Sequence, residues 1–177
     1  WMSHPAWPSM VWQTYDYYFE PTAAYFGCKK ACEPIHIQWN PVSDDVEVVN
    51  SYGKDRIGLT AKAEIFNMDG AAEWESEMEI DSREDSTVGC FKLEFPDNLS
   101  EVHFIKLALT EGDKVISDNF YWRSLEEGNF QALKSLPVTE VNNKTRVEHI
   151  GENWTVTTGL RNDSEVPALM IRLKVVG

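Results

Sequence analysis

The middle of this 177-residue chain alternates apolar and polar side chains with a period of two. In the longest run, residues 57–68, every second position is apolar: Leu59, Ala61, Ala63 and Ile65. A period of two sends successive side chains to opposite faces of a β-strand, whereas a helix needs a period of about 3.6. The pattern therefore predicts antiparallel sheet with one buried and one solvated face.

Seven runs of this kind fall between residues 34 and 122, and Asp-Asp, Asp-Gly and Glu-Gly-Asp turn signals separate several of them. We expect strands at residues 35–39, 46–50, 57–68, 72–81, 89–95, 101–110 and 114–122. Short strands at regular spacing are typical of an immunoglobulin-like (Ig-like) β-sandwich. The segment has no cysteine pair of the antibody kind, so this prediction of an all-β fold for residues 34–122 rests on the pattern alone.

The residues before this module favour a helix over residues 22–33. Pro21 suits a first helical turn, and the basic pair Lys29-Lys30 suits the last turn, where cations interact well with the helix dipole. Nine of the 21 aromatic side chains fall in residues 1–26. That density indicates a piece of a larger core or a ligand platform rather than a free tail.

The residues after the module read as a connector over 123–137, in which Ser124 and Glu127 offer a capping box for a short helix. Strand-like runs follow at residues 138–147, 154–160 and 168–176. Three strands cannot close a sandwich. We therefore expect an incomplete second β-sandwich within residues 123–177.

The formal charge of −13 belongs to the middle module, since residues 34–122 carry 7 basic and 19 acidic side chains. This balance argues against nucleic acid and anionic membrane surfaces as partners, because both are bound through Lys and Arg. No apolar run approaches the roughly 18 residues of a membrane span. One run carries glutamates at alternate positions, which we interpret as the solvated face of a strand rather than a cation site: Glu73, Glu75, Glu77 and Glu79.

No motif indicates a metal, a cofactor or a catalytic nucleophile. Cys28, Cys32 and Cys90 have no His or carboxylate at ligand spacing and are expected to be buried free thiols. Phosphate-binding, dinucleotide-binding and zinc-protease signatures do not occur in the sequence. Two of the four histidines, His36 and His103, fall in strand runs and are expected on the polar faces.

Residues 1–34 carry the most specific signal. They contain, in order, Trp-Met, Ala-Trp-Pro-Ser, Trp-Gln, Tyr-Asp-Tyr-Tyr, Ala-Tyr-Phe-Gly and Lys-Lys-Ala-Cys-Glu-Pro, and Asn-Phe-Tyr-Trp follows at residues 119–122. This run resembles the end of the catalytic (β/α)8 barrel of glycoside hydrolase family 2, in the branch of exo-β-glucosaminidases, β-mannosidases and mannosylglycoprotein endo-β-mannosidases. Residues 3–5, Ser-His-Pro, depart from the Leu-Asn-Asn of most relatives, in a loop at the face where barrel sites lie.

The resemblance implies that residues 1–33 are the last strand and helix of such a barrel. It implies a parent enzyme that is a retaining exo-acting β-glycosidase with two glutamates about 5 Å apart, one the acid/base and one the nucleophile. Both glutamates lie upstream in the family, so no catalytic residue is assigned to this chain. One substrate-binding residue carries over: Trp7, whose flat indole face would line the sugar subsite of the parent enzyme.

The leading hypothesis is a non-catalytic C-terminal part of a β-glycosidase, in which the Ig-like module supports the barrel. Its partners would be the rest of the same polypeptide and, for the parent enzyme, an oligosaccharide. The alternatives are a protein-interaction domain and a carbohydrate-binding module with Trp39, Trp74 or Tyr52 as platform, although both tryptophans are expected to point inward. The family resemblance alone favours a periplasmic or secreted location, and neither a cofactor nor a metal is expected.

Overall fold

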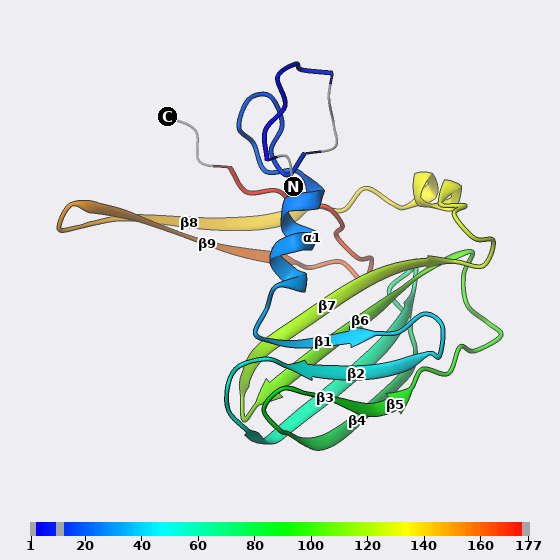
Figure 1. Ribbon diagram of the computed structural model, residues 1–177. Helices are drawn as coiled ribbons and strands as arrows, with labels where there is room; N and C mark the ends of the chain where they lie inside the picture. The colour runs from blue at the N-terminus through cyan, green and yellow to red at the C-terminus, as the bar shows by residue number, and fades with distance from the viewer. Residues whose placement is uncertain (1–2, 10–12, 175–177) are drawn as a thin grey trace. The chain divides into compact units, whose positions relative to one another are not determined.

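The computed structural model describes residues 3–9 and 13–174, and within them one α-helix precedes a series of strands (Figure 1). The elements in chain order are α1 (Ala23–Ala31), β1 (Ile35–Trp39), β2 (Asp45–Asn50), β3 (Arg56–Asn67), β4 (Ala72–Ser82), β5 (Ser86–Lys92), β6 (Val102–Glu111), β7 (Lys114–Ser124), the 3-10 helix η1 (Gln131–Ser135), β8 (Val141–Ile150) and β9 (Asn153–Asn162). Trp1 and Trp12 of the aromatic pattern, and Met2 of the Trp-Met motif, lie outside the described residues.

The chain packs as two compact units. The first consists of Trp1–Glu64, Glu75–Glu94 and Lys106–Tyr121. The second consists of Ile65–Trp74, Phe95–Ile105 and Trp122–Gly177. The second unit thus joins the segment after residue 122 to the ends of several sandwich strands.

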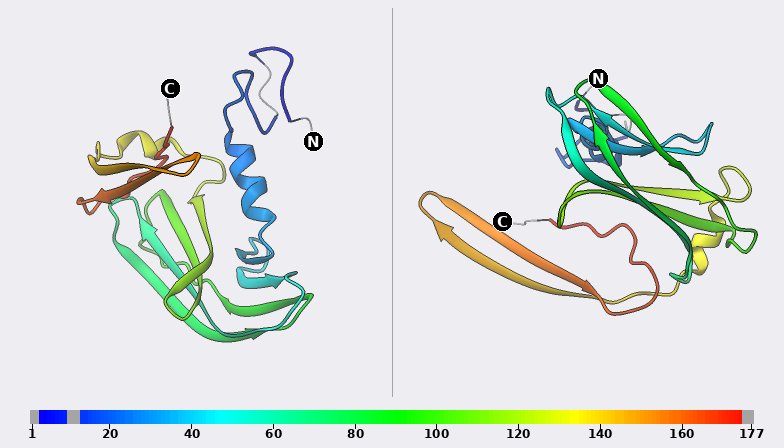
Figure 2. Two further views of the ribbon diagram at one scale, coloured as in Figure 1. Left: turned by 90° about the vertical axis from the view of Figure 1, so that its left-hand side faces the viewer. Right: turned by 90° about the horizontal axis from the view of Figure 1, so that it is seen from below.

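The strands β1 to β7 form two sheets that lie face to face (Figure 2). One sheet has the order β1-β2-β5 and the other β4-β3-β6-β7. Strands β1 and β2 pair antiparallel with Ile37 opposite Val48, and β2 pairs antiparallel with β5 with a register shift between Val46 and Glu47. The prediction of an all-β fold with Ig-like sheets is confirmed.

The core of the first unit is made of apolar side chains that the alternation predicts to point inward. Side chains with no exposed surface come from both sheets: Ile37, Val46, Val48, Leu59, Ala61, Ala63, Leu107 and Leu109. Burying a side chain of the size of Leu or Ile contributes about 1.5–3 kcal/mol. The opposite face of β4 is solvated as expected, with Glu75, Glu77 and Glu79 exposed.

The alternation misplaces one residue of β4. A strict period of two would place Met78 on the same face as Ile80, but Met78 is 45% exposed whereas Ile80 is 7% exposed. The reason is the position of the strand, because β4 is the edge strand of the four-stranded sheet. An edge strand has fewer neighbours to cover its inner face along its whole length.

The second unit contains the hairpin β8–β9, whose strands lie close to the expected runs at 138–147 and 154–160. The two strands pair antiparallel, with Val147 opposite Val156 and Thr145 opposite Thr158. No side chain of either strand is buried. The hairpin therefore has backbone pairing without a covered apolar face.

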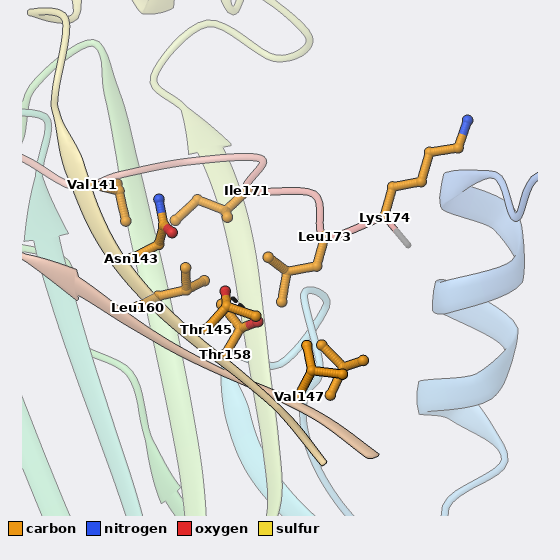
Figure 3. A pocket seen from close by; sticks show the side chains of 10 residues that line it. Val141, Asn143, Thr145, Val147, Thr158, Leu160, Ile171, Leu173 and Lys174 are labelled. Atoms are coloured by element: carbon orange, nitrogen blue, oxygen red, sulfur yellow. Dashed lines mark hydrogen bonds between the residues drawn. The ribbon is translucent and has the colours of Figure 1, made fainter. Parts of the chain in front are cut away.

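The third strand expected there, at residues 168–176, is not found in its described part, which ends at residue 174. Leu169, Ile171 and Leu173 do alternate, but the chain from 167 to 174 makes no strand pairing. Ile171 and Leu173 instead turn toward one face of the hairpin, where they line a hollow with residues of β8 and β9 (Figure 3). The alternating residues Ile171 and Leu173 therefore make side-chain contacts with the hairpin, but their backbone does not join its sheet.

The capping box predicted at Ser124 is also wrong. Ser124 is the last residue of β7, and the short helix η1 begins later, after Phe130. Gly128 adopts a φ of 76°, which breaks any helix started at residue 124. Asn129 then leads into η1, because its Oδ1 accepts the backbone N–H of Gln131 at 3.1 Å.

Candidate functional site

Trp7, the predicted sugar-contact residue, is 69% exposed in the first unit. It belongs to an aromatic segment that also exposes Tyr18 and Phe19, each at 72%. The ring of His4 stacks on Phe19 with centroids 4.0 Å apart, and His4 Nε2 lies 3.1 Å from the carbonyl oxygen of Tyr17. The structure therefore exposes the indole of Trp7 to solvent, in a segment that also holds a small group of stacked rings.

A tight turn over residues 16–20 holds these rings in place. The Asp16 carboxylate accepts the backbone N–H groups of Tyr18 at 2.8 Å and Glu20 at 2.9 Å, and the Asp16 N–H donates to the Glu20 carbonyl at 2.9 Å. Phe19 takes the left-handed φ of 64° that this turn requires. An aromatic residue in that region is unusual and marks local strain.

The aromatic segment is tied to the start of α1. Tyr15 N donates to the Ser3 carbonyl at 3.0 Å, and Thr22 Oγ1 donates to the carbonyls of Gln13 at 3.0 Å and Thr14 at 3.2 Å. Thr22 is the N-cap of α1, although its hydroxyl is used for these contacts rather than for capping. Hydrogen bonds thus join the N-terminal end of α1 to the aromatic segment.

Helix α1 confirms the predicted helix but buries none of its side chains. Phe26 on its apolar face is 58% exposed. A nine-residue helix has little stability of its own, since packing supplies most of the stability of helices in proteins. The contacts at its two ends therefore carry more weight than usual.

Glu33 lies between α1 and β1 in the chain and accepts hydrogen bonds from three elements. Its Oε1 accepts from Lys30 Nζ on α1 at 2.8 Å, and its Oε2 accepts from Ser117 Oγ on β7 at 2.7 Å. His36 Nδ1 on β1 lies 3.3 Å from the same Oε2. Lys30 also pairs with Asp118 on β7.

Two residues of β7 extend these contacts to the backbone of β1. Ile37 N donates to Ser117 Oγ at 3.2 Å, and Asn119 Nδ2 donates to the Ile37 carbonyl at 3.3 Å. Asn119 Nδ2 also lies 3.4 Å from His36 Nε2, so that Nε2 is the acceptor and Nδ1–H donates to Glu33. We call this group the Glu33 cluster: Lys30, Glu33, His36, Ser117, Asp118 and Asn119.

Hydrogen bonds within the Glu33 cluster favour the ionised forms of Glu33 and Lys30. Burial alone would raise the pKa of Glu33, but hydrogen bonds from Lys30, Ser117 and His36 outweigh burial and lower it. Burial would likewise lower the pKa of Lys30, and its hydrogen bonds to Asp118 and Glu33 outweigh this effect and raise it. Both groups stay ionised at neutral pH, so the cluster is a polar joint and not a proton-transfer pair.

Sequence reasoning singled out two motifs without predicting that they meet. One is the Lys-Lys-Ala-Cys-Glu-Pro run that contains Lys30 and Glu33, and the other is the Asn-Phe-Tyr-Trp run that begins at Asn119. Tyr121 of the second motif also receives the backbone N–H of Trp39 on its hydroxyl at 3.2 Å. The structure thus brings the two motifs together at the joint between helix and sandwich.

Both strand histidines are buried, although each ring keeps a polar partner. His36 is 9% exposed in the Glu33 cluster, and His103 is 2% exposed with Nδ1 lying 3.3 Å from the Ser100 carbonyl. Burial lowers the pKa of His103, and the nearby Arg123 acts in the same direction. Each ring is buried because a local polar partner satisfies at least one of its nitrogens.

The remaining titratable groups are candidates for metal ligands and reactive thiols. Among residues 3–9 and 13–174, no three His, Cys, Asp or Glu side chains come together in a way that could hold a metal ion. Burial raises the pKa of Cys90 to about 11, so this thiol stays protonated. The three cysteines are free as predicted, but none is fully buried: Cys28 and Cys90 are half-buried, and Cys32, the C-cap of α1, is exposed. The helices within the described ranges are too short and too polar to cross a bilayer.

The aromatic residues considered as sugar platforms are largely occupied. Trp39 is half-buried, donates from Nε1 to Asp44 at 3.3 Å and packs edge-on against Tyr121. Trp74 is half-buried as well. Tyr52 is 46% exposed, but the Arg56 guanidinium lies 4.4 Å from its ring centroid and covers one face. These contacts do not favour a carbohydrate platform on the sandwich.

A hollow of about 610 Å³ lies on one face of the β8–β9 hairpin in the second unit (Figure 3). Its lining is mostly aliphatic, and its central polar pair, Thr145 and Thr158, is engaged in a hydroxyl–hydroxyl contact of 3.1 Å. Such a lining offers little to orient a polar ligand. We assign no ligand to it.

Two family profiles match the chain. Residues 45–125 match the Mannosidase Ig/CBM-like domain, and residues 119–177 match the exo-β-D-glucosaminidase Ig-fold domain. The two matches meet at the Asn-Phe-Tyr-Trp run.

Curated relatives agree with these profiles. The exo-β-D-glucosaminidase of Hypocrea jecorina is 28% identical over 200 residues, covering 99% of this chain and 22% of the relative. The exo-β-D-glucosaminidase of Streptomyces avermitilis is 35% identical over 128 residues, covering 70% of this chain and 14% of the relative. The mannosylglycoprotein endo-β-mannosidase of Lilium longiflorum is 24% identical, covering 93% and 18%. The chain therefore spans about a fifth or less of the length of these relatives.

Two solved structures also resemble this chain. The exo-chitosanase CsxA of Amycolatopsis orientalis superimposes with a TM-score of 0.83 at 26% identity, over 93% of this chain and 22% of that one. The β-D-mannosidase of Dictyoglomus thermophilum superimposes with a TM-score of 0.64 at 22% identity, over 90% of this chain and 19% of that one. The second likeness concerns the fold alone.

Proposed function

We propose that this chain has a non-catalytic, supporting role in a retaining exo-acting β-glycosidase. It belongs to the exo-β-glucosaminidase and β-mannosidase branch of glycoside hydrolase family 2, as a C-terminal part with Ig-like domains. The Glu33 cluster is the observation that carries this proposal. It fastens the end of α1 to two edge strands of the sandwich, β1 and β7, with ionised and hydrogen-bonded groups. A sandwich that only bound sugar would not need such a joint to a helix.

In this proposal, residues 1–33 complete a catalytic barrel and Trp7 lines its sugar subsite. The exposure of the indole supports this assignment, because a flat apolar ring open to solvent can cover the C–H face of a pyranose. The exposed apolar face of α1 also fits, since it leaves Phe26 free to pack against the rest of a barrel. The partners are then the remainder of the same polypeptide and an oligosaccharide substrate.

The test compares this chain with the longer natural protein on nitrophenyl β-glycosides of glucosamine, mannose, galactose and glucuronic acid. We expect the longer protein to hydrolyse one of these sugars and this chain to hydrolyse none. Activity in this chain alone would overturn the non-catalytic role. Inactivity of both, combined with quenching of tryptophan fluorescence by glucosamine oligosaccharides, would favour a carbohydrate-binding module.

Two matched variants of the longer protein test Trp7. Trp7→Ala removes an indole that is 69% exposed, and Trp154→Ala removes one that is 68% exposed on β9. We expect Trp7→Ala to lower kcat/KM by about tenfold or more, in line with the loss of one good apolar contact to a substrate. Trp154→Ala is expected to leave kcat/KM unchanged. Equal kinetics in the two variants would remove Trp7 from the sugar site.

A further inference from the structure

The path from the sandwich to Trp7 is short and continuous. Ser117 on β7 donates to Glu33, Glu33 follows α1, and the N-cap Thr22 donates back to the carbonyls of residues 13 and 14. Tyr15, the next residue, bonds to Ser3, which lies four residues before Trp7. The hydrogen bonds in this path are 3.2 Å or shorter, and the remaining steps are helix α1 and short stretches of chain at Glu33 and between Ser3 and Trp7.

The helix in this path is held at its ends rather than along its side. Within Ala23–Ala31 no side chain is fully buried, and the half-buried Tyr25 contacts Tyr15 of the aromatic segment with ring centroids 5.3 Å apart. At its C-terminal end, Glu33 receives hydrogen bonds from α1, β1 and β7 at one carboxylate. A carboxylate that accepts from three elements sets both the distance and the angle between them, which a single ion pair cannot do.

We propose that Glu33 is a positioning residue: through α1 it sets the place of the Trp7 segment relative to the sandwich, and thereby the fit of the sugar subsite. This inference rests on the proposed function for its kinetic consequence. Its structural half concerns only contacts within this chain. The chemistry is one of orientation, since Glu33 is not expected to touch the substrate.

The first experiment measures amide hydrogen exchange in this chain, for the wild type and for Glu33→Gln. The amide side chain keeps the shape of Glu33 but loses the charge that Lys30 pairs with, at 2.8 Å. We expect exchange in α1 to accelerate by about tenfold while exchange in the core strands β2 and β3 stays unchanged. Ser117→Ala removes another hydrogen bond of the Glu33 cluster. We expect it also to accelerate exchange in α1 and to leave exchange in β2 and β3 unchanged.

A matched variant shows whether any lost ion pair has this effect. Arg56 and Glu111 form an ion pair of 3.1 Å within the same unit, and Glu111→Gln breaks it away from α1. We expect Glu111→Gln to leave exchange in α1 unchanged. Unchanged exchange in Glu33→Gln, or equal acceleration in Glu111→Gln, would overturn the positioning role.

The second experiment measures kcat and KM of the longer protein on the nitrophenyl glycoside that it hydrolyses best, well below its unfolding temperature. Misplacement of a contact residue weakens ground-state and transition-state binding together, so KM is expected to rise by about three- to tenfold with kcat nearly constant. Glu111→Gln is expected to match the wild type. A joint that only stabilised the fold would lower the Tm of Glu33→Gln and leave KM unchanged.

The outcomes separate the two proposals. Activity in the wild type with an unchanged KM in Glu33→Gln overturns the positioning role and leaves the proposed function intact. A wild type without glycosidase activity overturns the proposed function and the effect on sugar binding with it. Accelerated exchange in α1 together with a raised KM supports both.

Discussion

Ser117 holds two segments with one hydroxyl group. Its Oγ donates to Glu33 and accepts the backbone N–H of Ile37, and the residue is 3% exposed. Ser117→Ala leaves that N–H without its partner, and an unpaired buried donor costs about 1–3 kcal/mol. We expect urea denaturation to show a loss of this size in the free energy of unfolding.

Ser135→Ala is the matched control for this prediction. The Ser135 hydroxyl also makes one short hydrogen bond, to the Ala132 carbonyl at 2.7 Å, but it is exposed in η1. Water can replace a bond at such a site, so the expected change is within about 0.5 kcal/mol. Similar losses in both serine variants would show that Ser117 has no special role.

His103 makes the stability of the second unit depend on pH. Burial lowers its pKa below the ordinary value of 6.5. Between 6.5 and the lower folded pKa, the unfolded chain binds a proton that the folded chain does not, so stability falls as pH drops through this window. Above 6.5 both states are neutral, and this histidine adds no pH dependence.

His103→Asn tests this linkage because the Asn amide can still donate to the Ser100 carbonyl while it cannot titrate. We expect urea denaturation at pH 7.5, 6.5 and 5.5 to give a smaller loss of stability on acidification in the variant than in the wild type. The other histidines contribute equally to both proteins. Parallel stability curves would show that His103 takes up its proton in the folded state.

The inward residues of the central strands could be predicted from the alternation, because both sheets use one face for the core. Ile37, Val48 and Ala63 follow that rule. His36 and His103 do not, because a polar ring can be buried wherever a carboxylate, amide or carbonyl happens to lie within reach. Most of those partners lie in loops or near strand ends, where a two-residue period does not predict the position of a side chain.

Two turns need the same left-handed backbone at a glycine but differ in what surrounds that glycine. Gly70 between β3 and β4 and Gly112 between β6 and β7 both have a positive φ, of 89° and 58°. A Cβ on Gly112 would meet nothing within 4 Å, whereas a Cβ on Gly70 would lie 1.9 Å from the Glu165 carbonyl oxygen. Both glycines are needed for the turn, but only Gly70 also allows a second segment to approach.

Gly112→Ala is therefore expected to cost about 1–2 kcal/mol from the left-handed backbone alone. Gly70→Ala should cost at least about 1 kcal/mol more, because the chain at Glu165 has to move away. Urea denaturation gives the two costs, and limited proteolysis should cut near residue 165 only in Gly70→Ala. Equal costs and equal proteolysis would contradict the close approach.

For individual strands, the sequence was most informative where an alternating pattern lay next to a clear turn signal. The pairs β3–β4 and β6–β7 have alternation on both sides of an Asp-Gly or Gly-Asp turn, and both were predicted close to their observed bounds. Residues 168–174 have the alternation but form no strand in the structure. The Ser124 capping box was lost to the continuation of β7 and to the turn at Gly128.

Across the whole chain, the Glu33 cluster could not be predicted although both of its motifs could be identified. Glu33 and Ser117 are 84 positions apart, and they meet only because β1 and β7 are edge strands of different sheets. Local pattern predicts which strands exist and which faces are buried. It does not predict which edges of two sheets will be bridged by side chains.

The chain should also be unevenly stable, and amide hydrogen exchange can measure this. Strands β3 and β6 surround buried side chains such as Leu59 and Leu107, whereas β8 and β9 bury none. A two-stranded hairpin without a covered face is marginally stable in water. We expect amides of β8 and β9 to exchange at least about 100-fold faster than those at the centres of β3 and β6.

The exposed face of the hairpin makes the dependence on protein concentration the decisive control. Val147, Trp154 and Val156 are 56%, 68% and 44% exposed on paired positions of that face. If β8 and β9 gain protection as the concentration is raised, the apolar face is being covered by a second copy of the chain. Strong protection at every concentration would contradict the prediction, because it would require the isolated hairpin to be as stable as strands that enclose a core.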